Sequence, residues 1–148
     1  MENNFGDLVC SFQKSDTELI GAGFSTYKGN DYFYIRIFQQ ALFEQDNIIP
    51  TQKGITLKID HLNDVSDGIQ KVADVMTSDK VVKVIQKNNK EQVRVGVSEF
   101  KGSIYVYVRI YFKNTEGNYL PTKKGINIPL SKYEQLVEMI KQLSEKNR

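Results

Sequence analysis

Strict alternation of apolar positions with a second set of side chains is the clearest pattern in this chain, and it occurs twice. In residues 105–111 every second position is apolar, and the others are Tyr, Tyr, Arg and Tyr; in residues 32–38 they are Tyr, Tyr, Arg and Phe. A period of two is typical of a β-strand with one buried face. Residues 91–100 alternate in the same way, with Val93, Val95 and Val97 on one side. The pattern therefore predicts paired strands that share a core in each half of the chain.

The two halves of the chain are copies of each other. Residues 9–36 align with residues 82–109 at a constant offset of 73, and residues 50–55 align with residues 121–126 at an offset of 71. The two-residue difference falls between Phe38 and Pro50, where the first copy has the longer loop. A fixed internal offset indicates one structural unit that is built twice.

Each copy predicts four strands followed by a helix. The glycine of Lys28-Gly29 and of Lys101-Gly102 supplies the positive φ that a tight hairpin needs between the second and third strands. The helices are expected to start at Asp60 and at Ser131, the latter in a capping box with Glu134, and to bury apolar stripes at helical spacing. The strands are expected near residues 8–12, 18–27, 32–38 and 55–59, and near residues 81–85, 91–100, 105–111 and 126–130.

We expect an α+β fold in which two tandem ββββα repeats, residues 7–76 and 80–148, form an intramolecular pseudo-dimer. Each half has only about 70 residues, which is marginal for an independent core, so the halves should pack helix against helix. The antiparallel sheets then have helices packed on one side, each helix covering the sheet of its own unit. The other face of each sheet stays in contact with water.

Composition argues against several function classes. With one Cys (Cys10) and one His (His61), the chain cannot form an internal disulfide or a Cys/His metal site. Their counterparts in the second copy are Lys83 and Lys132, so no catalytic residue is shared. We therefore expect no enzyme, no catalytic residue, no metal and no cofactor. The lack of a long apolar run and of a signal peptide predicts an intracellular protein without membrane contact. Its compartment would be the nucleus in a eukaryote, or the cytoplasm or nucleoid in a bacterium or virus.

Aromatic and basic side chains occupy the wet face of both predicted sheets. The net charge is only +2, so affinity for nucleic acid must come from local clusters. Bases stack on aromatic rings for about 1–3 kcal/mol each while Lys and Arg meet phosphates, so this face predicts binding of single-stranded nucleic acid with weak sequence preference. Three alternatives stay open: the tyrosines pack against the other copy, the face binds a polypeptide, or Lys-Gly is only turn chemistry.

A set of motifs in the second copy falls in a fixed order between residues 91 and 143. These are Val97-Ser98-Glu99-Phe100-Lys101-Gly102, then Tyr107-Val108-Arg109-Ile110-Tyr111-Phe112, then Pro121-Thr122-Lys123-Lys124-Gly125-Ile126-Asn127-Ile128, and Tyr133-Glu134-Gln135-Leu136. The set closely resembles the single-stranded-DNA-binding domain of the transcriptional coactivator family called positive cofactor four. The first copy resembles it more loosely, through Tyr27-Lys28-Gly29, Ile35-Arg36 and Lys53-Gly54-Ile55. Two copies in one chain also resemble the arrangement of the purine-rich-element-binding proteins.

The resemblance implies a four-stranded antiparallel sheet with a helix, dimerisation through the helices, and a grip on melted or single-stranded DNA that does not depend on sequence. It also implies roles for an aromatic residue and a lysine at the hairpin, a strand arginine, a basic pair before Gly-Ile and an aromatic residue three positions past the arginine. With the open-face residues, the expected binding residues are Tyr27, Lys28, Tyr32, Tyr34, Arg36, Lys53, Arg94, Phe100, Lys101, Tyr105, Tyr107, Arg109, Phe112, Lys123 and Lys124.

The first copy departs from this pattern, since Gln52 and Gln39 replace one basic and one aromatic residue. We expect it to bind more weakly or to face a different stretch of the strand. The Ser-, acid- and Lys-rich segment typical of the family's coactivators is not found here, which favours plain strand binding over activator-dependent transcription. The expected ligand is single-stranded DNA, with RNA and melted duplex as alternatives. Transcription or replication proteins are the expected protein partners, and a further homodimer is left open.

Overall fold

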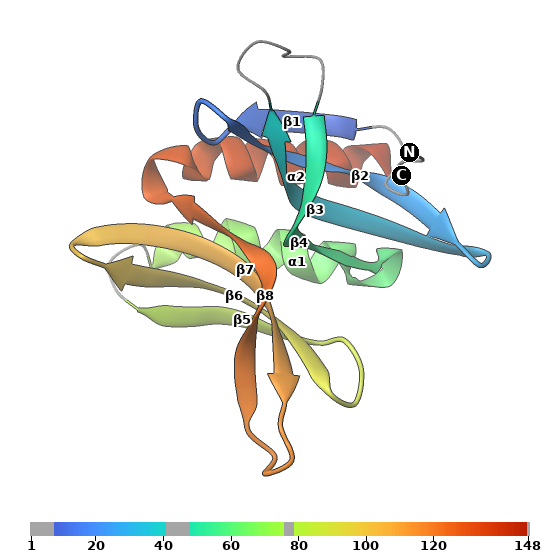
Figure 1. Ribbon diagram of the computed structural model, residues 1–148, viewed down its shortest axis with the longest axis vertical. Helices are drawn as coiled ribbons and strands as arrows, with labels where there is room; N and C mark the ends of the chain where they lie inside the picture. Colours follow the sequence, from blue (N-terminus) through green and yellow to red (C-terminus); the bar gives the residue numbers. More distant parts are fainter. Residues whose placement is uncertain (1–7, 41–47, 76–78, 148) are drawn as a thin grey trace.

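The chain forms two four-stranded antiparallel sheets, each followed by a helix, in a computed structural model that describes residues 8–40, 48–75 and 79–147 (Figure 1). Strands follow sequence order within each sheet. This confirms the predicted fold class. Most of the longer first-copy loop, residues 77 and 78 of the link between the copies, and the predicted repeat limits at residues 7, 76 and 148 lie outside the described residues. The first half contains β1 Leu8–Gln13, β2 Glu18–Tyr27, β3 Asn30–Gln40, β4 Ile48–Lys58 and α1 Leu62–Lys71. The second contains β5 Lys80–Gln86, β6 Glu91–Phe100, β7 Ser103–Lys113, β8 Tyr119–Pro129 and α2 Tyr133–Lys146.

The hairpins β2–β3 and β6–β7 end in equivalent two-residue turns. Lys28 and Gly29 have φ of 50° and 79°, and Lys101 and Gly102 have φ of 52° and 80°. Positive φ at both central residues defines a type I′ turn, whose twist matches that of the flanking strands. The prediction of a glycine turn is confirmed, but the left-handed lysine before it was not predicted from the sequence.

The fourth strands are longer than the sequence predicted. β4 and β8 each have 11 residues and start before the proline. Pro50 pairs with Phe38, and Pro121 pairs with Tyr111, next to a shift of register after Arg36 and Arg109. Proline is tolerated in an edge strand or at a bulge because no ladder hydrogen bond from its nitrogen is needed there. The prediction that these strands begin only after Lys-Gly was therefore wrong.

The predicted helix caps were also wrong. A one-turn 3₁₀ helix, Ile59–His61 or Leu130–Lys132, comes between each last strand and its α-helix. Asp60 and Ser131 lie inside these turns, and the positions that precede α1 and α2 make no side-chain capping hydrogen bond. The chain turns directly out of the edge strand, which moves each helix start past its predicted cap. The stripes themselves are buried as predicted at Leu62, Val65, Ile69, Val72, Tyr133, Leu136, Ile140 and Leu143.

Each helix lies mainly against the sheet of the other half, not against its own. α1 contacts β5 and β6, α2 contacts β1 and β2, and the two helices contact each other (Figure 1). The Cys10 thiol on β1 donates a hydrogen bond to the Met139 carbonyl oxygen of α2, with 3.4 Å between Sγ and the oxygen. The expectation that each helix covers its own sheet is corrected, because the halves exchange helices across a common core.

One hydrophobic core joins the two halves. Buried residues from both sheets and both helices belong to a single cluster. At its centre the Tyr133 hydroxyl donates to the Ile69 carbonyl at 2.6 Å and accepts from the Ala73 amide at 3.1 Å, which ties α2 to the end of α1. The predicted pairing of the halves within one chain is therefore confirmed. None of the described helices is long and apolar enough to cross a membrane.

Candidate nucleic-acid interface

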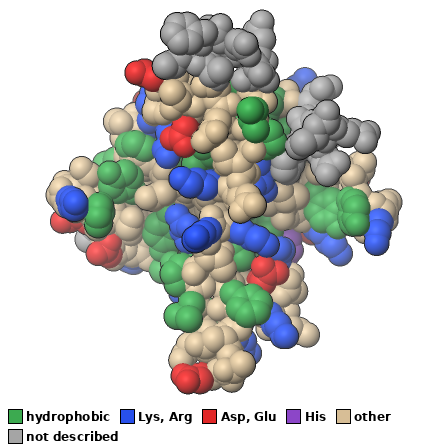
Figure 2. Space-filling view, viewed as in Figure 1, with side chains coloured by type: hydrophobic (Ala, Val, Ile, Leu, Met, Phe, Trp, Pro, Cys, Tyr) green, Lys and Arg blue, Asp and Glu red, His purple; other side chains and the backbone are tan. Residues whose placement is uncertain are grey.

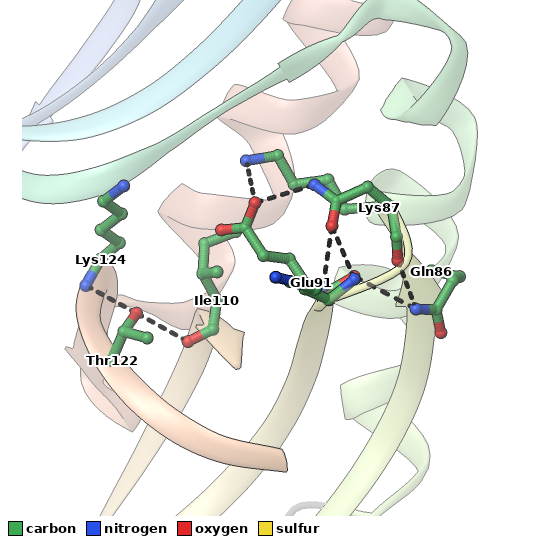
Figure 3. A network of polar contacts seen from close by, with 8 residues as sticks. Gln86, Lys87, Glu91, Ile110, Thr122 and Lys124 are labelled. Atoms are coloured by element: carbon green, nitrogen blue, oxygen red, sulfur yellow. Dashed lines mark hydrogen bonds and ion pairs between the residues drawn. The ribbon is translucent and has the colours of Figure 1, made fainter. Parts of the chain in front are cut away.

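A threonine stabilises the bulge in each sheet and positions the lysine that follows it. The Thr122 hydroxyl donates to the Ile110 carbonyl at 2.8 Å and accepts from the Lys124 amide at 3.2 Å (Figure 3). In the first half, Thr51 makes the same two contacts, with Ile37 and Lys53, at 2.7 and 3.1 Å. Where the register shifts, the backbone carbonyl lacks its hydrogen-bond donor on the neighbouring strand. The threonine hydroxyl donates the hydrogen bond instead. The Pro-Thr-x-Lys-Gly-Ile motif thus stabilises the bulge and fixes the backbone position of the lysine.

The strand arginines are held by the same threonines. Arg36 Nη1 donates to the Thr51 carbonyl at 3.0 Å, and Arg109 Nη1 donates to the Thr122 carbonyl at 2.9 Å. Arg36 also donates from Nη2 to Thr56 Oγ1 at 3.0 Å, and partial burial lowers its pKa below the ordinary value. An arginine side chain stays charged in proteins even so. Each guanidinium is therefore a positive charge fixed beside the bulge.

Strands β4 and β8 lie against each other, which brings the arginine of one half close to the lysines of the other. One hollow of about 540 Å³ contains Arg36 together with Lys87, Lys123 and Lys124. Its counterpart of about 680 Å³ contains Arg109, Lys14, Lys53 and Lys123. Figure 2 shows Lys and Arg side chains gathered at the centre of this face. We call the two hollows the basic junction.

Two carboxylates at the rim of the basic junction are tied to lysines. Lys14 Nζ lies 3.6 Å from Glu18 Oε1. In the counterpart pair, Lys87 Nζ lies 3.3 Å from Glu91 Oε1 (Figure 3). Burial raises the pKa of Glu91, but the hydrogen bond from Asn88 and the charge of Lys87 outweigh burial and hold that pKa below its ordinary value. The junction contains more lysine and arginine than carboxylate, so it keeps a positive balance that suits phosphates.

An exposed aromatic ring stands at each hairpin tip. The side chains of Tyr27 and Phe100 are each 63 % exposed. The neighbouring Lys28 Nζ is 5.4 Å from the Tyr27 ring centroid, and Lys101 Nζ is 5.3 Å from the Phe100 ring centroid. A flat ring that is open to solvent and has a cation beside it can stack on a nucleobase.

The outer face of the second sheet is open and aromatic. Burial, and then the interaction with Tyr111, raise the pKa of Tyr107 to about 12. The Arg94 guanidinium lies 4.3 Å from the Tyr111 ring centroid and 5.8 Å from that of Tyr119. A hollow of about 440 Å³ adjoins these rings and includes Arg109 in its lining.

The same face of the first sheet is closed. Tyr34 and Phe38 are buried, with exposed fractions of 0 and 1 %, and their ring centroids are 6.4 Å apart at an interplanar angle of 63°. They pack with Leu19, Leu8 and Ile48 in a small apolar cluster. The expectation that Tyr34 lies on a wet face is corrected, because apolar residues of its own sheet cover it.

One glycine allows this closure. A Cβ atom at Gly21 would lie 2.6 Å from Leu8 Cδ2 and 2.9 Å from Phe38 Cε1. The counterpart of Gly21 in the second half is Arg94, whose guanidinium lies over the Tyr111 ring. This difference, together with the changes from Leu19 to Gln92 and from Ile48 to Tyr119, separates an apolar outer face from a cationic one.

Comparison with known proteins places the chain in a family. Residues 87–139 match the family model described as Transcriptional Coactivator p15 (PC4). The bacteriophage T5 homologue of the eukaryotic transcription coactivator PC4, implicated in recombination-dependent DNA replication, is 33 % identical over 47 % of this chain and 81 % of its own, with a TM-score of 0.41. The chain belongs to the PC4 family. Two crystal forms of a PC4 homologue from Burkholderia pseudomallei are 26 % and 27 % identical over 46 % and 45 % of this chain and 92 % and 98 % of their own, with TM-scores of 0.41 and 0.42.

The PC4 match falls on the half whose outer face is open. There Arg94, Tyr105, Tyr107 and Arg109 are half-buried, while Lys123 and Lys124 are exposed. Phe112, at 45 % exposed, lies at the far end of β7, where it pairs with Leu120. In the first half, Tyr32 and Arg36 are half-buried and Lys53 is exposed.

Three further residues lie beside the predicted site residues but were not themselves predicted. Lys14 and Lys87 line the basic junction. Their identity at the offset of 73 was a usable signal, but each follows a first strand, well away from Lys-Gly in sequence. Tyr119 lies near Arg94, and its counterpart is the apolar Ile48, so the internal comparison gave no signal there.

Proposed function

We propose that this PC4-family chain binds single-stranded DNA with little dependence on sequence and acts in replication, repair or transcription. The observation that carries the proposal is the basic junction, to which both repeats contribute cations, between two exposed aromatic tips. Lysine and arginine meet phosphates whatever the sequence, and ring stacking tolerates every base. The T5 relative, named for recombination-dependent DNA replication, supports the replication role.

The test is a titration of the full chain with labelled single-stranded and duplex oligonucleotides at several salt concentrations. We expect the single strand to bind more tightly and its affinity to fall steeply with salt, since phosphate contacts release counterions. Equal affinity for both forms would argue against the proposal. Salt-insensitive association with a polypeptide would favour a protein-binding module, and a matched RNA strand that bound more tightly than DNA would favour an RNA regulator.

Replacing both Lys123 and Lys124 by Gln is expected to weaken single-strand binding and flatten its salt dependence. The slope of log affinity against log salt should fall by roughly 0.7 for each lost phosphate contact, or about 1.4 for the pair. The control is Lys141→Gln with Lys146→Gln, which removes the same charge from α2, outside the lining of both junction hollows. Equal changes of slope in the two double variants would show that only net charge matters.

Phe100→Ala is expected to reduce the affinity for single-stranded DNA about five-fold, near the lower end of what one stacked base contributes. Phe100→Tyr keeps a ring at the hairpin tip and should bind as the unchanged protein does. Because Phe100 is mostly exposed, thermal unfolding should be nearly unaffected in both variants. Unchanged affinity in the alanine variant would remove this tip from the binding surface.

A further inference from the structure

The hollow on the outer face of the second sheet, which we call the aromatic hollow, has the make-up of a seat for a nucleobase. Its volume is about 440 Å³, and its lining includes Tyr107, Tyr111, Val81, Pro121 and Asn127. The Tyr107 side chain packs over Gly96, where a Cβ atom would collide with the Tyr107 hydroxyl, and both tyrosines line the hollow. Pockets that take a single-stranded base combine aromatic or apolar walls with polar groups that meet the base edge.

A carboxylate lies in the lining of this otherwise uncharged or basic hollow. Asp79 Oδ1 accepts a hydrogen bond from the Glu99 amide at 2.7 Å, which fixes the side chain against β6. Asp79 lines the same hollow as Tyr107 and Tyr111, so its carboxylate lies beside the aromatic wall. A carboxylate repels phosphate, so this hollow is unsuited to the DNA backbone, whereas it can accept hydrogen bonds from the N–H groups of a base.

We propose that the aromatic hollow takes one unpaired base of the bound strand and that Asp79 makes guanine the preferred base. This rests on the proposed binding of single-stranded DNA. Guanine carries two adjacent donors, N1–H and the N2 amino group, on one edge, where a carboxylate can accept both. Adenine and cytosine offer one amino group there, and thymine offers one imide N–H. The O6 acceptor of guanine suits a donor from the cations that line the hollow, Lys80 and Arg109.

The described residues of the first repeat form no equivalent seat. The counterparts of Tyr107 and Tyr111 are the buried Tyr34 and Phe38, and the counterpart of Val81 is Leu8, which packs against them. The counterpart of Asp79 in the sequence is Gly6, which carries no carboxylate. Within the described residues the chain therefore has one guanine seat, added to a surface that otherwise ignores sequence.

The test compares the affinity of the full chain for oligothymidylates that carry, at every fourth position, guanine, hypoxanthine, adenine or cytosine. This spacing leaves no guanine run. We expect guanine to bind about ten-fold more tightly than adenine or cytosine, within the range of one bidentate base contact. Hypoxanthine lacks only the N2 amino group and should lie between them. Asp79→Asn can still accept from the Glu99 amide and should reduce the preference to about two-fold or less.

Asp31→Asn is the matched control, because it removes one negative charge from the exposed start of β3 and should leave the guanine preference intact. Equal affinity of the unchanged protein for all four oligonucleotides would overturn the proposed seat while leaving strand binding in place. A guanine preference that survives Asp79→Asn would overturn the role of the carboxylate. Failure to bind any of the strands would reject the proposed function itself, and the seat with it.

Discussion

Gly125→Ala is expected to lower the free energy of unfolding by about 3 kcal/mol, as overpacking against rigid neighbours does. A Cβ atom there would lie 2.6 Å from the Val108 carbonyl oxygen and 2.7 Å from Arg109 Cα. Both are backbone atoms of β7, so no side-chain rotation can relieve the contact. The strands must separate where Arg109 meets Thr122 and the bulge begins. Denaturant unfolding followed by circular dichroism measures the loss.

Two other glycines provide the comparison for this result. Gly54→Ala places a Cβ 2.7 Å from the Ile35 carbonyl oxygen and 2.8 Å from Arg36 Cα. It should lower the free energy of unfolding by the same amount as Gly125→Ala, its counterpart in the second repeat. Gly117→Ala meets nothing within 4 Å and is strained only by its φ of 86°, so it should cost about 1 kcal/mol. If Gly125→Ala proved no worse than Gly117→Ala, close approach of β7 and β8 would not explain the Lys-Gly-Ile motif.

The sequence was sufficient to predict the features that depend on period and repetition. Alternation gave β2 and β6 with their observed bounds, and the offset of 73 gave the equivalence of the two hairpins. The exposed tips at Tyr27 and Phe100 followed from the turn glycines, because a two-residue turn leaves the preceding side chain at the end of the sheet. Local patterns of this kind determine the local backbone geometry without contacts from distant segments.

Features that depend on contacts between distant segments could not be predicted. The burial of Tyr34 requires Leu8 and Phe38 to meet above Gly21, and none of these residues signals this alone. The identical motif Tyr-x-Tyr-x-Arg therefore lies in two different environments. Likewise, neither helix stripe shows which sheet it covers, since an apolar face fits either one. The exchange of helices appears only when both halves are assembled.

Complementary differences in side-chain size mark this exchange. On one side of the pseudo-dimer the small Cys10 of β1 lies beside Met139 of α2, since its thiol donates to the Met139 backbone carbonyl. On the other side their counterparts are the long Lys83 and Gly68, and a Cβ at Gly68 would lie 2.9 Å from Lys83 Cβ. Each of the two neighbouring pairs combines a large and a small residue, and the strand carries the small one at the first site and the large one at the second. We therefore expect each half to fit the other half better than it would fit a second copy of itself.

Gly68→Met is consequently expected to destabilise the full chain by about 3 kcal/mol, even though methionine is the better helix former by close to 1 kcal/mol. The new side chain has no space between α1 and the neighbours Lys83 and Val95. Replacing Lys83 by Cys in the same chain recreates the Cys10–Met139 pair at the other site. That double variant should recover most of the lost stability, measured by denaturant unfolding.

Lys83→Cys alone is the second single variant needed to complete the double-mutant cycle with Gly68→Met. Lys83 pairs with Asp67 at 2.9 Å and with Asp64 at 3.7 Å, and the hydrogen bond with Asp67 raises the pKa of the lysine. Losing these exposed pairs should have a small effect compared with filling the site of Gly68. Residues in contact are expected to show coupling, so the two changes together should be much less harmful than their sum. Additive losses would mean that the two sites do not pack by size, and that the fit between the halves resides elsewhere in the core.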